Sequence, residues 1–91
     1  MITQSVLVIN RLGLHARAAA KLVRLASGYS SDVHLSRENL NQHIDAKSIL
    51  GVLMMAASQG TRLTVSVAGG DEVEAGAAIR ELFESGFGEE S

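Results

Sequence analysis

Apolar and polar residues alternate in four short segments of the chain, a period typical of β-strands with one buried face. Val6 and Val8 share one side of the first segment, with Leu7 as a mild irregularity, and Leu63, Val65 and Val67 share one side of the last. A polar connection at residues 37–41 joins the middle two segments into a predicted hairpin. The four predicted strands cover residues 3–9, 32–36, 42–46 and 61–68.

Three other segments carry apolar residues at helical spacing. The first predicted helix covers residues 16–27, and Gly28 is placed to end it in a left-handed conformation. The second, residues 49–57, is apolar almost all round, and Ser48 precedes it as an N-cap residue. The third starts at Asp71 and ends near Gly86, leaving residues 88–91 as a frayed acidic tail. The expected buried stripes are Ala19, Leu22, Val23 and Ala26 in the first helix, and Ala75, Ala78, Ile79, Leu82 and Phe83 in the third.

The predicted element order is therefore βαββαβα, within a single domain spanning residues 1–91. One-sided alternation in every strand requires a sheet that helices cover on one face while the other face meets water. The fold class is α+β.

Composition narrows the possible functions. The chain has 91 residues, 46% of them hydrophobic, and its lack of cysteine excludes disulfides and thiolate zinc sites. A net charge of −2 argues against general nucleic-acid binding. No apolar run is long enough to span a bilayer, so no membrane association and a cytoplasmic location are expected. His34 and His43 should point away from the core as solvated residues, and no metal site is expected.

Candidate chemistry lies at the junction of the first strand and first helix. His15 falls at the predicted helix N-terminus, where the amides of Ala16 and Arg17 lack helical partners and the helix dipole is positive. Such an end binds phosphate, and the Arg17 guanidinium suits phosphate oxygens. The combination indicates a phosphorylatable histidine; a surface histidine or a plain N-cap is the alternative.

Two motifs resemble those of a known family. Residues 13–17 (Gly-Leu-His-Ala-Arg) resemble the active-site signature of the HPr-type phosphocarriers of the bacterial phosphotransferase system. Residues 45–51 resemble the family's second signature, and the order and spacing of all elements match. Residues 10–13 and 81–87 are closer to the nitrogen-related branch, NPr, than to the sugar-transport branch. Ala18 stands where the family usually has proline.

The resemblance implies a fold and a function. The fold would be the HPr-like open-faced sandwich, an antiparallel four-stranded sheet with three helices on one face. His15 would accept a phosphoryl group at Nδ1 from phospho-enzyme I, ultimately from phosphoenolpyruvate, and pass it to an EIIA-type protein. Such a monomeric carrier is not an enzyme and needs no cofactor. The alternatives are a small ACT-like ligand-binding domain and an adaptor that carries no phosphate.

The expected partner interface combines charge and apolar surface. Arg17, Lys21 and Arg24 share one face of the first helix, which favours docking of acidic surfaces; a solvated helix face without a partner is the alternative. Ser48 is a candidate regulatory site, since the resemblance implies its phosphorylation by an HPr kinase/phosphorylase. The alternative is that Ser48 only caps the second helix. Leu14, Ile49, Leu50 and Leu53 are expected to complete the apolar part of the interface.

Overall fold

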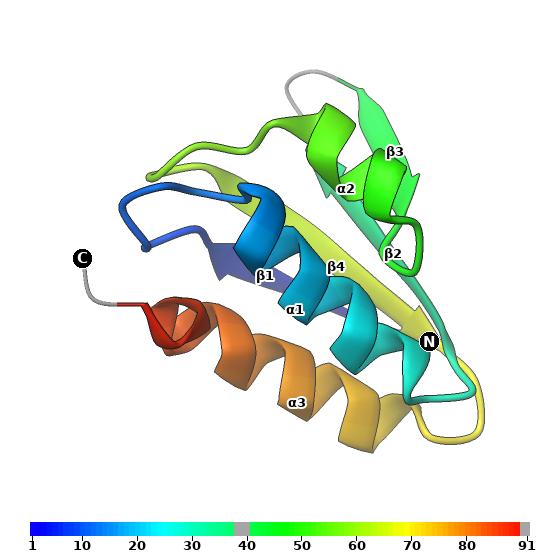
Figure 1. Ribbon diagram of the computed structural model, residues 1–91. Coiled ribbons are helices and arrows are strands. Elements are labelled where there is room, and N and C mark those ends of the chain that lie inside the picture. Colours follow the sequence, from blue (N-terminus) through cyan, green and yellow to red (C-terminus); the bar gives the residue numbers. More distant parts are fainter. Residues whose placement is uncertain (38–40, 90–91) are drawn as a thin grey trace.

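The computed structural model describes residues 1–37 and 41–89, and its element order is the predicted βαββαβα (Figure 1). Most element ends lie within one or two residues of the predicted ones, and a short 3₁₀ turn follows the last helix. Residues 38–40 of the predicted polar connection and residues 90–91 lie outside the described residues. The elements are β1 (Ile2–Leu7), α1 (Ala16–Ser27), β2 (Asp32–Arg37), β3 (Gln42–Asp45), α2 (Ile49–Met55), β4 (Arg62–Ala68), α3 (Glu72–Glu84) and the 3₁₀ turn η2 (Gly86–Gly88).

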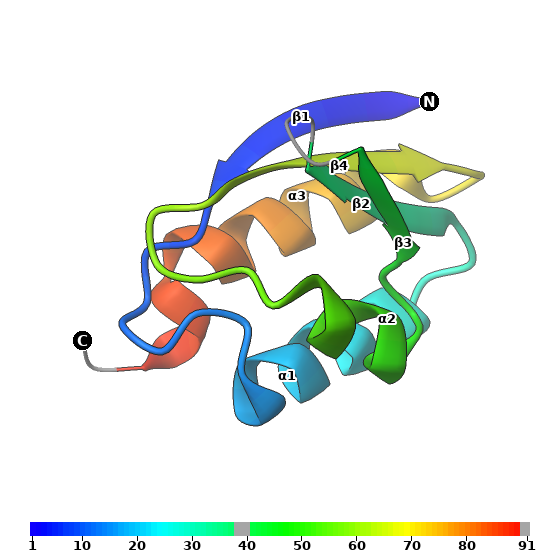
Figure 2. The same ribbon diagram turned by 90° about the horizontal axis from the view of Figure 1, so that it is seen from above.

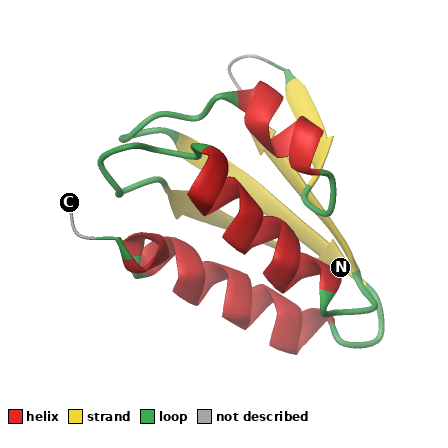
Figure 3. Ribbon diagram, in the orientation of Figure 1, coloured by secondary structure: helices red, strands yellow, loops and turns green. Residues whose placement is uncertain are grey.

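The four strands form one antiparallel sheet in the order β1-β4-β2-β3. The three helices lie on one face of this sheet, with α1 and α3 side by side (Figures 1 and 2). Helices and strands thus form two layers (Figure 3), which confirms the predicted open-faced sandwich. Within the described residues, no helix is long and apolar enough to cross a membrane.

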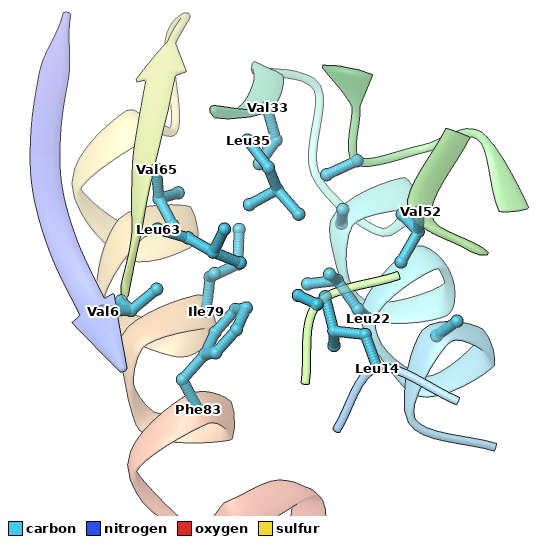
Figure 4. Close-up of a cluster of buried hydrophobic side chains, with 14 of the residues drawn as sticks. Val6, Leu14, Leu22, Val33, Leu35, Val52, Leu63, Val65, Ile79 and Phe83 are labelled. Carbon is cyan, nitrogen blue, oxygen red and sulfur yellow. The ribbon is translucent and has the colours of Figure 1, made fainter. Parts of the chain in front are cut away.

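The core fills the space between the sheet and the helices. Leu63, Val65 and Val67 of β4 are buried, as the alternation predicted. Leu63 and Val65 face the helix residues Leu22 and Ile79 across the interior (Figure 4). On α1 the buried stripe differs slightly from the prediction, because Val23 is only partly buried while Ala18 is fully covered.

Three predictions, two about helix ends and one about the C-terminal tail, are wrong. Gly28 has a right-handed backbone (φ −78°), and its N–H is bonded to the carbonyls of Ala26 and Leu25. Helix α2 ends at Met55, two residues before the predicted end at residue 57, because Ala56 is its C-cap in a left-handed conformation (φ +51°). Glu89 is not frayed, since its carboxylate bonds to Asn10 and His15.

Asp71 links the start of α3 to the segment that leads into β2. Its carboxylate accepts hydrogen bonds from the backbone N–H groups of Ser30 and Ser31, both at 2.9 Å, and from the Ser31 hydroxyl. The Ser31 hydroxyl and the Ser30 amide lower the pKa of Asp71 to about 2. Because these bonds favour the ionised carboxylate, folding is more favourable when Asp71 is charged.

Asp71→Asn should therefore lower the melting temperature at neutral pH. The pKa is lower in the folded than in the unfolded state, where it is about 3.9. The stabilisation is complete above that unfolded value and is lost as the pH falls towards the folded pKa of about 2. Thermal unfolding of both proteins across this pH range should show curves that converge at low pH. An equal gap at every pH would contradict the prediction, and Glu81→Gln serves as the control for removing one exposed carboxylate of α3.

Candidate functional site

A tight turn delivers the chain from β1 to the start of α1. Gly13 has φ +68°, and a Cβ at this position would lie 2.4 Å from the carbonyl oxygen of Ala57. The next N–H, that of Leu14, donates to the same carbonyl at 2.8 Å. A side chain at position 13 would therefore strain the backbone and push the loop away from the segment after α2. This contact fixes where α1 begins.

His15 is the N-cap residue of α1. Its backbone is extended (φ −76°, ψ −179°), and its ring Nδ1 accepts a hydrogen bond from the N–H of Arg17 at 3.3 Å. The opposite ring nitrogen, Nε2, lies 2.6 Å from a carboxylate oxygen of Glu89. The side chain is 27% exposed. One nitrogen thus faces the helix start and the other faces the C-terminal segment.

The surroundings of Nδ1 suit an anion. The intrahelical hydrogen bonds of α1 begin with the N–H of Ala19, which donates to the His15 carbonyl. The amides of Ala16, Arg17 and Ala18 therefore have no acceptor within the helix backbone, and that of Arg17 donates to His15 Nδ1. Arg17 is exposed beside them. A surface depression of about 760 Å³ opens here, lined by residues that include Arg11, Arg17, Lys21, His15 and Glu89. Free amides, the helix dipole and cationic side chains give it a positive character.

The C-terminal segment closes the other side of this depression. Glu89 accepts a hydrogen bond from the side-chain amide of Asn10 at 2.9 Å, and Lys21 donates to the Phe87 carbonyl at 2.6 Å. The Asn10 bond lowers the pKa of Glu89, burial opposes that shift, and His15 lowers the pKa further. Neither Glu89 nor the role of Asn10 was predicted from the sequence. The signal in the sequence that the C-terminal segment packs against the domain was Phe87, an apolar residue that follows the glycine expected to end the helix.

An apolar surface lies on α2 and on the loop before His15. Ile49, Leu50 and Leu53 are exposed, Leu50 at 69%, as expected of the predicted interface residues. Two further residues were missed: Met54 is 77% exposed and Leu12 is 68% exposed. The prediction that Leu14 belongs to the partner interface is wrong, because Leu14 is 4% exposed and belongs to the core. Its N–H is turned to the Ala57 carbonyl by the Gly13 turn, and its side chain points inward (Figure 4).

Other candidates take ordinary structural places. The Ser48 hydroxyl accepts a hydrogen bond from the Gly51 N–H at 3.2 Å, which is the contact of a helix N-cap. Arg24 lies in the last turn of α1, and the amine of Lys21 donates a hydrogen bond to the Phe87 carbonyl. His34 and His43 stack on the open face of the sheet with ring centroids 4.9 Å apart. Among residues 1–37 and 41–89, no group of three or more His, Cys, Asp or Glu side chains is placed to hold a metal.

Comparison with known proteins identifies the relatives of this chain. A family model described as "PTS HPr component phosphorylation site" matches residues 2–85. The phosphocarrier protein HPr of Xylella fastidiosa is 46% identical over 91 residues, the full length of both chains. The phosphocarrier protein NPr of Escherichia coli is 38% identical over 89 residues, 98% of each chain, which is consistent with the expected nitrogen-branch relationship.

A solved structure gives the same result for the fold. The crystal structure of HPr-C-His from Thermoanaerobacter tengcongensis superimposes with a TM-score of 0.94 at 41% identity, covering all of both chains. Family model, relatives and fold agree over nearly the whole chain. The chain belongs to the HPr family, phosphocarrier proteins of the phosphotransferase system that carry a phosphoryl group rather than catalyse a reaction.

Proposed function

We propose that His15 is the phosphoacceptor, that phospho-enzyme I is the donor and that an EIIA-type protein is the acceptor. The observation that carries this proposal is the direction of the ring: Nδ1 faces the first amides of α1, where it accepts the Arg17 N–H. A phosphoryl group on Nδ1 would lie among those amides. Its negative charge would be stabilised by the helix dipole without any enclosing pocket.

The reaction makes modest demands on the protein. The Nδ1 lone pair of the neutral ring forms a bond to phosphorus as the bond between phosphorus and the donor atom of phospho-enzyme I breaks. Positioning and charge stabilisation supply most of what such a transfer needs. The exposed Arg17 guanidinium and the amides of Ala16 and Arg17 offer both, and they leave the phosphoryl group accessible to the next protein.

The partners would dock on the surface beside His15. Ile49, Leu50 and Leu53 are exposed apolar residues, and Met54 and Leu12 extend the same kind of surface. Arg17 and Arg24 would draw acidic partner surfaces towards it, since charges around an interface speed encounter and set specificity. Lys21 contributes charge at this edge while its amine holds the C-terminal segment.

Phosphorylation of Ser48 by an HPr kinase/phosphorylase stays a prediction. The hydroxyl already serves as the N-cap of α2. A phosphate there would add about two negative charges next to Ile49 and Leu50. It would repel acidic partners from the docking surface and so slow the phosphorylation of His15.

His15→Ala should abolish phosphoryl acceptance while the domain stays folded. Loss of the cap should cost about 1 kcal/mol of stability, too little to unfold an ordinary domain. The assay is incubation with enzyme I and phosphoenolpyruvate, followed by mass spectrometry for an acid-labile phosphate. His43→Ala, which removes an exposed histidine of the open sheet face, should react like wild type. An undiminished phosphate on His15→Ala would refute the proposal, and an unphosphorylated wild type would favour an adaptor.

Arg17→Ala should still accept phosphate, but more slowly. Charge-assisted contacts to phosphate are worth about 1.5–3 kcal/mol and less when exposed to water, so roughly a tenfold loss in rate is expected. Rapid-quench measurement of transfer from phospho-enzyme I checks this, with Arg80→Ala on α3 as the matched control. Equal rates for wild type and Arg17→Ala would remove Arg17 from the site.

Leu50→Glu should weaken binding to enzyme I without a large loss of thermal stability. Burying one leucine side chain is worth about 1.5–3 kcal/mol, so the affinity should fall by roughly tenfold or more. Val73→Glu is the matched control, because Val73 is a similarly exposed apolar residue (65%) on α3. Titration calorimetry of the three proteins decides. Equal losses of affinity in both variants would assign the effect to general charge repulsion.

A further inference from the structure

We propose that Glu89 is a positioning residue for His15: its carboxylate keeps the proton of the neutral ring on Nε2 and stabilises the positive charge that the ring gains when Nδ1 is phosphorylated. This inference deepens the proposed function and rests on it for the phosphorylated state. It concerns a side chain 74 residues away from His15 along the chain.

The C-terminal segment is anchored strongly enough to hold a carboxylate in place. Phe87 is buried and packs edge-to-face on Phe83, with ring centroids 5.0 Å apart. Its backbone is left-handed (φ +60°), a conformation that costs a bulky residue free energy and is maintained here by that packing. The Lys21 amine donates to the Phe87 carbonyl at 2.6 Å, and the Glu89 N–H donates to the Gly86 carbonyl at 3.1 Å. Glu89 therefore approaches the ring from a fixed backbone.

The hydrogen bonds around Glu89 define which ring nitrogen carries the proton. The side-chain nitrogen of Asn10 donates both to the Gly13 carbonyl at 2.7 Å and to Glu89 Oε1 at 2.9 Å, so its amide can point only one way. An ionised carboxylate has no proton to give, and its second oxygen must accept the bond from His15 Nε2 at 2.6 Å. The Asn10 bond also lowers the pKa of Glu89, which keeps it ionised at neutral pH. Nε2 is therefore protonated, and Nδ1 keeps its lone pair.

The same contact balances charge during transfer. When Nδ1 forms its bond to phosphorus, the donor atom of phospho-enzyme I takes back the electron pair of the bond that breaks. The Nε2 proton stays on the ring, which becomes positively charged beside the carboxylate. When the phosphoryl group moves on, the electron pair returns to Nδ1 and the ring leaves as neutral imidazole rather than as its anion. Glu89 thus lies on the side of the ring away from the phosphate, where its charge is favourable.

Glu89→Gln tests this, because a carboxamide can accept only one of the two bonds that the carboxylate accepts. Its NH₂ group must face either Asn10 or Nε2, and both are donors. In protein carrying ¹⁵N-labelled histidine, at alkaline pH where the ring is neutral, we expect the ¹⁵N shifts of His15 to show a larger Nδ1–H population. Transfer from phospho-enzyme I should slow by about tenfold. Glu84→Gln, which removes an exposed carboxylate at the end of α3, should change neither the ¹⁵N shifts of His15 nor the transfer rate. Glu89→Asp, which keeps the carboxylate, should restore part of both.

The outcomes separate this inference from the proposed function. An unchanged tautomer in folded Glu89→Gln would overturn the inference even if wild type is phosphorylated normally. Faster transfer in Glu89→Gln would also overturn it, since Glu89 would then cover His15 rather than position it. If phospho-enzyme I fails to phosphorylate wild type at all, the proposed function fails, and the part of the inference that concerns charge during transfer fails with it. The tautomer measurement then still decides whether Glu89 determines which nitrogen of the His15 ring carries the proton in the free protein.

Discussion

The geometry of the site depends on one close approach between two segments that are far apart in the sequence. The Gly13 turn lets the chain lie against the Ala57 carbonyl, and the Leu14 N–H bonds to that carbonyl while the Leu14 side chain enters the core. A loop anchored on both its backbone and its side chain has little freedom to shift. His15 follows immediately, so the place at which its ring caps α1 is fixed by the core packing of Leu14. The backbone at His15 is therefore positioned by core packing, while hydrogen bonds to the Arg17 N–H and to Glu89 orient its partly exposed ring.

Local pattern predicted much of this arrangement. The bounds of α1 and the N-cap positions of His15 and Ser48 follow from signals within a few residues of each helix start. The inward residues of β4 follow from simple alternation. Leu14 was assigned wrongly, because alternation and helical spacing carry no information about a turn residue. Its orientation depends on Ala57, more than forty positions later in the chain.

The contact of Glu89 with His15 could not be predicted for the same reason. Glycine followed by a short acidic end is typical of a fraying terminus, and that was the prediction for residues 88–91. The tertiary packing of Phe87 against Phe83 overrides this local tendency and brings Glu89 back to the ring. Ala18 shows the reverse case, in which a local argument is sufficient. It lies in the first turn of α1, before the first intrahelical donor at Ala19, so a residue with or without an N–H is accommodated there. Its burial explains why a small apolar residue suits the position.

A carboxylate beside a histidine proposed to accept a phosphoryl group poses an electrostatic problem, and the two groups are separated across the ring. The two nitrogens of an imidazole point in different directions, so Glu89 on Nε2 and an anion near Nδ1 do not compete for the same donors. The Arg17 amide lies on the Nδ1 side, whereas Asn10 and Lys21 hold the C-terminal segment that carries Glu89. The Asn10 and Lys21 contacts are made to Glu89 and to the Phe87 carbonyl, not to the first amides of α1. In a chain of net charge −2, attraction of a phosphoryl group must therefore come from this local arrangement and not from the overall charge.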